Sequence, residues 1–358
     1  MSTVLQERAR RFYDLFGVSV PVLNAPMMGV TTPAMVAAVA AAGGLGVLPG
    51  DRLTAEELRQ AIRDTRALTD KPFAVNLRVP AKRENTDNEQ SVHEAMSELK
   101  ALLGCPTEYV PHPITPFEDL FDVVVDERIP VVSVSFGGLR EIYADKLKAL
   151  GVKTIGAATT LREAKVMRSA EVDAVVVQGV EAGGPRLNFE QPDADSLVGL
   201  MSLIGPSVRA TRLPVIAAGG IMTGAQMAAC LMAGATAVQV GTLLLRTPES
   251  AAHPLHKAAL EYASDSSTRL TRVFNGRLTR VIPNGLVEAV EESGVELADY
   301  PSQWRVMAPI HAAARAQDRD DLMPMPAGQG AALARTAPAY DVLSNLVNEC
   351  RRCFGLKD

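Results

Sequence analysis

The 358-residue sequence contains few aromatic residues and few cysteines. Aromatic side chains make up 4% of it, with Trp304 as the one tryptophan, and there are four cysteines. So few cysteines in a chain of this length exclude a disulfide-stabilised scaffold. So few aromatic residues mean that small aliphatic side chains must fill the core, as they do in α/β proteins rich in alanine, valine and glycine.

A large charge of one sign and long apolar stretches are absent too. The net charge is −5, with 22% charged and 47% hydrophobic residues. This composition is normal for a folded domain and provides no basic field for nucleic acid or an anionic membrane. No stretch is suited to span a bilayer, and the N-terminus, MSTVLQERARRFYDLFG, lacks the apolar segment of a signal peptide. We therefore expect a cytoplasmic protein with neither nucleic acid nor membrane as a partner.

Short segments rich in valine and isoleucine alternate with longer amphipathic stretches. Their nearly continuous apolar character is typical of parallel strands covered by helices on both faces. Eight strand–helix alternations in about 240 residues match a (β/α)8 barrel, a TIM barrel, in number and size. Alternation alone leaves an open, doubly wound sheet as the alternative. The eight expected strands are 20–24, 45–48, 72–77, 130–134, 152–157, 173–177, 214–218 and 237–240.

The alternation ends after residue 264. Residues 265–335 contain charged clusters, prolines and a Gly-Gln-Gly sequence, but no clear strand–helix units. We expect the barrel to occupy residues 1–264. Residues 265–358 would then form a smaller, mostly helical segment over the barrel mouth, followed by a C-terminal helix.

The expected strands also indicate where a ligand binds. In such barrels the ligand lies in the loops after the C-terminal ends of the strands. Gly219-Gly220 follows the seventh expected strand, and Gly241-Thr242 follows the eighth. Loops at these two places often bind phosphate through backbone N–H groups and a helix N-terminus. The spacing therefore predicts a phosphate site without a Walker-type lysine motif.

Amide side chains follow two other strands. Asn76 ends the third expected strand, and Gln178 follows the sixth. A phosphate site with amides around a barrel mouth suits flavin mononucleotide, FMN, whose ring presents N–H and C=O edges. A phosphorylated sugar substrate suits the same residues, so this pattern leaves both ligands open.

Longer motifs resemble one family, the nitronate monooxygenases, formerly called 2-nitropropane dioxygenases. The similar stretches are NAPMMGVTTP, AAGGLGVL, PFAVNL, QGVEAGG, LPVIAAGGIMTGAQMAACLMAGATAVQVGTLLL and AGQG, and the resemblance covers essentially the whole chain. It implies an FMN-dependent barrel oxidoreductase that oxidises alkyl nitronates with O2 and needs no metal. Carried over to this sequence, the family pattern implies FMN contacts from Ala25, Pro26, Met27, Asn76, Gln178, Gly183, Gly220, Gln239, Val240, Gly241 and Thr242.

Two positions depart from the family pattern. Relatives usually have a histidine after EAGG, where it acts as a catalytic base, and this sequence has Pro185 there. A second histidine of the family, in an SFHFG stretch, corresponds to Ser135 in VSVSFGG. Proline cannot accept a proton, so the resemblance does not identify a catalytic base in this chain.

Three residues are then candidates for a catalytic role. Ser135 is one, and His112, in an irregular loop, is another. Arg186 would lie at the barrel mouth beside Pro185 and attract an anionic substrate. We interpret His253 and His256 as surface or helix-packing residues.

Without the usual histidine, two other functions stay open beside nitronate oxidation. One is an FMN-dependent NAD(P)H reductase acting on an enoyl thioester or a quinone, and the other is a flavin-binding protein that has lost catalysis. For nitronate oxidation, the partners are a small, anionic substrate and O2. The sequence leaves open whether the chain forms an oligomer.

Overall fold

The computed structural model describes residues 3–80, 88–106, 108–110 and 113–356. Its centre is a parallel eight-stranded sheet with the strand order β1-β9-β8-β6-β5-β4-β3-β2. A backbone bridge between Leu23 in β1 and Leu45, just before β2, joins the two ends of this strand order, so the sheet closes into a barrel. The predicted barrel is confirmed, and the open sheet is wrong. The strands are β1 Val22–Asn24, β2 Gly46–Pro49, β3 Phe73–Arg78, β4 Val131–Ser135, β5 Lys153–Ala158, β6 Ala174–Gln178, β8 Val215–Ala218 and β9 Ala237–Val240.

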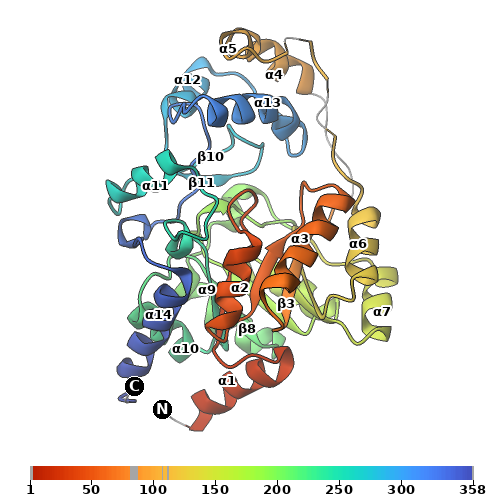
Figure 1. The fold of residues 1–358 in the computed structure, drawn as a ribbon, viewed down its shortest axis with the longest axis vertical. Helices are drawn as coiled ribbons and strands as arrows, with labels where there is room; N and C mark the ends of the chain where they lie inside the picture. The colour runs from red at the N-terminus through yellow and green to blue at the C-terminus, as the bar shows by residue number, and fades with distance from the viewer. Residues whose placement is uncertain (1–2, 81–87, 107, 111–112, 357–358) are drawn as a thin grey trace.

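Helices surround the barrel (Figure 1). Threonine side chains begin four of them, because the hydroxyl of Thr32, Thr54, Thr160 or Thr223 accepts the N–H of the residue three positions later. This capping satisfies N–H groups that the helix itself leaves without a partner. The helices are α1 Thr3–Phe16, α2 Pro33–Ala41, α3 Ala55–Leu68, α6 Phe117–Asp126, α7 Glu141–Ala149, α8 Leu161–Ser169, α9 Leu200–Thr211 and α10 Gly224–Ala233.

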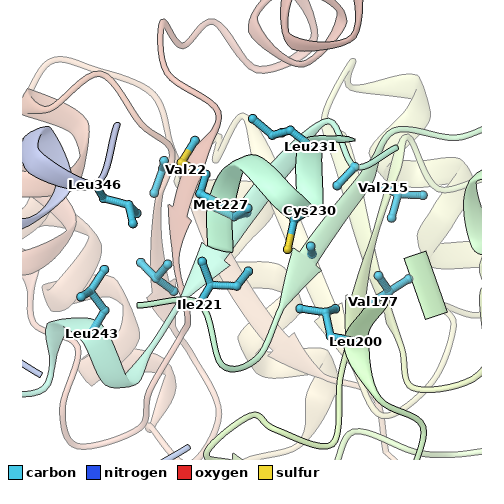
Figure 2. Close-up of a cluster of buried hydrophobic side chains, with 14 of the residues drawn as sticks. Val22, Val177, Leu200, Val215, Ile221, Met227, Cys230, Leu231, Leu243 and Leu346 are labelled. Carbon is cyan, nitrogen blue, oxygen red and sulfur yellow. The ribbon is translucent and has the colours of Figure 1, made fainter. Parts of the chain in front are cut away.

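The C-terminal helix α14, Ala339–Cys353, packs on the barrel. Its Leu346 belongs to the apolar cluster between the strands and α10, which also contains Met227 and Cys230 (Figure 2). The N–H of Gly224, the first residue of α10, donates to Oε2 of Glu349 at 2.9 Å. The chain therefore returns to the barrel at its C-terminal end.

The part of the structure over the barrel mouth, which we call the lid, combines two segments that lie far apart in the sequence (Figure 1). Val92 and Met96, from the insertion after β3, share an apolar core with Val306, Met307 and their neighbours. The boundary at residue 264 stays a prediction, but the lid core also takes residues from before it. Its helices are α4 Glu89–Ala95, α5 Ser97–Leu102, α12 Gly285–Ser293 and α13 Ser302–Ala316, and α11 Pro254–Glu261 leads into it.

A small antiparallel sheet connects the lid to the barrel. Its order is β10-β11-β7, with β10 Arg269–Thr271, β11 Thr279–Val281 and β7 Gly184–Pro185. Because β7 belongs to the loop after β6, this sheet fixes the lid to the barrel mouth. Three short 3-10 turns, Asp193–Ser196, Thr242–Leu244 and Ala331–Leu333, complete the elements. No helix among the described residues is both long and apolar enough to cross a membrane.

One buried side chain closes the barrel between β1 and β2. Asn24 is fully buried, and its Oδ1 accepts the N–H of Val47 at 2.8 Å. Its Nδ2 donates to the carbonyl of Val47, also at 2.8 Å. The amide thus forms the two hydrogen bonds that a neighbouring backbone would form in a longer strand.

We expect Asn24→Ala to destabilise the protein by about 2–4 kcal/mol, because it leaves the buried N–H and C=O of Val47 without these partners. Urea denaturation followed by far-UV circular dichroism measures the loss. Asn345→Ala, on the exposed side of α14, is the matched control and should change the midpoint little. Equal midpoints for the two variants would contradict the role of Asn24.

Candidate functional site

A cavity of about 390 Å³ lies where the strands end, between the barrel and the lid. Its size is within the range of small-molecule sites in proteins. Every residue that the family pattern associates with FMN lines it, as do Ser135 and Pro185. His112 is outside the described residues. The barrel side of the cavity is rich in glycine and amide groups and adds the ring of Phe136 after β4, whereas most other aromatic rings, the arginines and the histidines come from residues after 252 and the loop after β2.

Glycines from three distant motifs meet at one edge of this cavity. Gly219 and Gly220 have φ values of +117° and +67°, in the left-handed region that glycine adopts without strain. A Cβ on Gly183 would lie 2.5 Å from the backbone of Gly328, in the late AGQG sequence. The N–H of Gly328 donates to Oγ1 of Thr242 at 2.9 Å. A side chain on Gly183 would collide with the AGQG backbone, so this glycine lets the two loops pack against each other at the cavity edge.

Several N–H groups at the start of helix α10 already have partners within the protein. Oε1 of Gln226 accepts the N–H groups of Met222 at 2.8 Å and of Thr223 at 3.0 Å. Glu349 binds the N–H of Gly224, and Oγ1 of Thr223 binds that of Gln226. The part of this helix N-terminus in a phosphate site stays a prediction, and the loop glycines are the other candidate donors.

Hydrogen bonds fix the amide side chains at the cavity wall. Nδ2 of Asn76 donates to Oγ of Ser133 at 2.9 Å, and Oγ of Ser135 lies 3.5 Å from Oδ1 of Asn76. Nε2 of Gln239 donates to the carbonyl of Asn24 at 3.2 Å. Ser135 thus helps to orient an amide, and the amides present defined donors and acceptors to a ligand.

Arg186 does not lie where the sequence analysis placed it. It is 3% exposed and is not part of the cavity wall. Its guanidinium donates to the carbonyls of Gln178, Thr159 and Ser196. Burial lowers the pKa of Arg186 to about 10. The reason for the difference is that the loop after β6 folds back over this side chain, so Arg186 holds the loop and is not available to a substrate.

Pro185 faces the cavity as part of β7. It pairs with Thr279 of β11, and its carbonyl accepts a hydrogen bond from Nε2 of Gln178 at 3.1 Å. The pyrrolidine ring brings no titratable group to the site. The position that carries a base in the family pattern therefore contributes only shape in this chain.

Three histidines of the cavity wall were not identified from the sequence. His253 and His256 come from the start of α11 and His311 comes from α13, so the interpretation of His253 and His256 as surface or packing residues missed their place at the cavity. The lone local signal was the spacing of Trp304 and His311, seven residues apart on one helix and hence on one face.

Two of these imidazoles are neutral, and of these His256 is buried and His311 is half-buried. Burial lowers the pKa of His256 to about 4, although a hydrogen bond to the Pro326 backbone opposes the shift. Burial and the charge of Arg52 lower the pKa of His311 to about 3. Nε2 of each ring is buried and has no hydrogen-bond partner among the described residues. Each ring therefore has an unused nitrogen, but its low pKa makes it a poor base near neutral pH.

Comparisons with known proteins identify the family of this chain. A family model described as nitronate monooxygenase matches residues 9–349. A Pseudomonas aeruginosa protein named nitronate monooxygenase is 39% identical over 348 residues, which are 95% of this chain and 99% of that protein. A protein of the same name from Paraburkholderia phytofirmans is 35% identical, over 97% of this chain and 96% of that protein.

Solved structures share the fold of this chain. A nitroalkane oxidase from Streptomyces ansochromogenes has a TM-score of 0.89 at 35% identity, over 96% of this chain and 99% of that one. FabK from Thermotoga maritima has a TM-score of 0.75 at 28% identity, over 96% and 97% of the two chains. The fold is an α/β barrel, and the family model and named relatives make the chain an enzyme of the oxidoreductase class. The chain belongs to the nitronate monooxygenase family, and the resemblance seen in its motifs is confirmed.

The buried histidines predict a loss of stability in mild acid. Below pH 6.5 both histidines are protonated in the unfolded state. In the folded state His256 stays neutral down to about pH 4 and His311 down to about pH 3. The free energy of unfolding should fall by about 1.4 kcal/mol per pH unit for each histidine in this window, and above it the two histidines make no difference. Urea denaturation at several pH values measures the slope.

His311→Gln should reduce that slope. His253→Gln is the matched control, because His253 lies at the same cavity but pairs with Asp318 at 3.2 Å near the surface. If the two variants and the parent protein lose stability equally between about pH 6.5 and pH 4, the explanation by buried imidazoles is wrong.

Proposed function

We propose that this protein binds FMN and oxidises alkyl nitronates with O2. The observation that carries the proposal is that all the residues associated with FMN in the family pattern line one cavity. When bound, FMN supplies the redox chemistry that passes electrons from an organic substrate to O2. The chain's own residues bind and orient the reactants and shield them from water.

The donor set of the cavity fits this cofactor. The loops with Gly183, Gly220 and Gly241-Thr242 bring backbone N–H groups to the cavity edge, which suits a phosphate group. Asn76 and Gln178 offer oriented amides that match the edges of an isoalloxazine ring. The larger, apolar part of the wall suits the ring itself.

A nitronate is the substrate form that the site favours. Pro185 and Ser135 supply no general base, and we infer that Pro185 occupies the place of the usual histidine. A neutral nitroalkane must lose a proton from carbon before oxidation, whereas a nitronate has already lost it. The missing base therefore favours a substrate that has already lost its proton, which is the anionic nitronate.

We expect the purified protein to release FMN, and not FAD, at near one per chain after acid precipitation and chromatography. Gly220→Asp should abolish flavin binding, because its carboxylate would face the phosphate. Gly220→Asn has the same shape without the charge and is the matched control, and it should retain more flavin. Recovery of FAD, or no flavin uptake on titration, would contradict the proposal.

The enzyme should discriminate between the two forms of one substrate. We expect turnover of propyl-2-nitronate and, at neutral pH, a rate about 10²–10⁴-fold lower for 2-nitropropane, the usual contribution of a positioned base. Pro185→His should recover part of the activity towards 2-nitropropane. Steady-state oxygen consumption with both forms measures this.

Histidines elsewhere provide the control for the missing base. His112→Ala, His256→Ala and His311→Ala should leave the small nitroalkane rate unchanged. Efficient oxidation of 2-nitropropane by the parent protein, abolished in one of these variants, would refute the argument.

An anaerobic experiment tests the function itself. Mixing the flavin-loaded protein with propyl-2-nitronate should bleach the flavin absorbance, and mixing it with NADH or NADPH should not. Bleaching by the nicotinamides alone would indicate a reductase, and no change with either reagent would indicate a flavin-binding protein without this catalysis.

A further inference from the structure

Arg277 is a largely buried cation at the cavity without a carboxylate partner. It lies in the turn between β10 and β11, where the lid meets the barrel (Figure 1), and it lines the cavity. Among the described residues, no carboxylate forms a salt bridge with it. Burial lowers the pKa of Arg277, yet a guanidinium stays protonated at physiological pH. A charge kept in such a place without a counter-ion points to a ligand of opposite charge.

One edge of this guanidinium has no hydrogen-bond partner among the described residues. Nη1 donates to the carbonyl of Asn188 at 3.1 Å. Nε is buried without a hydrogen-bond partner, and no described residue accepts a hydrogen bond from Nη2. Nε and Nη2 form the side of an arginine that can bind two oxygens of one planar group. The open edge is therefore the one suited to such a group.

Aromatic rings hold the guanidinium in place. Its central carbon lies 4.1 Å from the centroid of the Phe136 ring and 5.6 Å from that of Tyr300. Arg78 lies 4.9 Å from the same Tyr300 ring. Stacking against rings fixes the plane of a guanidinium, so less freedom is lost when a ligand binds.

The carboxylates nearest to this region are all engaged with other arginines. Asp51, the one acidic residue of the described cavity wall, lies 3.2 Å from Nε of Arg78 and 3.6 Å from Nε of Arg52. Asp193 and Asp299 pair with Arg272. The charges of Asp193 and Asp299 raise the pKa of Arg277, but neither residue forms a salt bridge with it, so the guanidinium has no direct counter-ion in the described part of the chain.

The other arginines of the wall are less suited to bind an anion. Arg52 already has Asp51 beside it. Arg315 is exposed, and its Nη2 donates to the carbonyl of Ala251 at 2.7 Å. Arg186 is outside the cavity. Arg277 alone among them combines a place at the wall, a free donor edge and no counter-ion in the described part of the chain.

We propose that Arg277 binds the two oxygens of a planar anion in this cavity and, given the function proposed above, that this anion is the nitronate group of the substrate. A nitronate carries its charge on two oxygens in one plane, as a carboxylate does, and a guanidinium matches that geometry with two parallel hydrogen bonds. Arg277 is thus a substrate-binding residue, in the role that the sequence suggested for Arg186.

Steady-state kinetics of the flavin-loaded enzyme test this role. Arg277→Gln should raise KM for propyl-2-nitronate about 10- to 100-fold with a smaller change in kcat, as expected for binding shared by substrate and transition state. Arg277→Lys keeps the charge without the paired donors and should give an intermediate KM. Arg315→Gln, another arginine of the same wall, is the matched control and should change KM less than about two-fold.

A binding measurement gives a readout that does not depend on turnover. Isobutyrate has the charge, the two oxygens and nearly the shape of propyl-2-nitronate but cannot be oxidised in the same way. Calorimetric titration should show that Arg277→Gln weakens isobutyrate binding by a factor similar to the rise in KM, whereas binding of neutral isobutyramide stays unchanged. Flavin content and thermal unfolding confirm that each variant is folded.

The outcomes separate this inference from the proposed function. If the parent protein does not oxidise the nitronate but loses isobutyrate binding in Arg277→Gln, the proposed function fails and the anion site stands. If isobutyrate binds the parent and Arg277→Gln equally, or not at all, the inference is overturned even where nitronate is oxidised. If Arg277→Gln loses its flavin while Arg315→Gln keeps it, Arg277 serves the cofactor and the inference is also overturned.

Discussion

Closure of the barrel is the constraint on which the rest of the structure depends. Strands β1 and β2 are three and four residues long, and the backbone bridge between Leu23 and Leu45 is supported by the side chain of Asn24, which completes the hydrogen bonds to Val47. Because a closed parallel barrel brings all strand ends to one rim, loops from every part of the chain meet there. The cavity exists because the ring is closed.

The loop after β6 connects the barrel to the lid and fixes the position of the lid. The buried Arg186 binds three carbonyls around it, and Glu163 accepts the N–H groups of Phe189 and Glu190 with one oxygen. So anchored, the loop offers Gly184 and Pro185 as a strand to the lid sheet. The same loop that forms the cavity wall thus determines where the lid sits.

The two halves of the cavity differ in chemistry as a result. The barrel side supplies glycine backbone and oriented amides, which suit a neutral ring and a phosphate. The titratable and charged groups come largely from the lid, among them His256, His311 and Arg277. The family motif places a base on the barrel side, but this chain has Pro185 there. Its ionic chemistry is therefore concentrated opposite the glycine-rich side.

The sequence by itself determined the eight strands, the glycine turns and the amides that follow them, because local hydrophobic periodicity and turn residues encode these features. It did not determine which charged side chains reach the cavity. Arg186 and Arg277 lie in loops of similar polarity, and only the folding of the β6 loop over Arg186 buries that residue while the turn between β10 and β11 directs Arg277 to the wall. Strands of two or three residues in the lid sheet are too short to show a period, and their pairing depends on contacts between distant segments. The tertiary structure alone decided these placements, since they arise from packing across the chain and not from any local pattern.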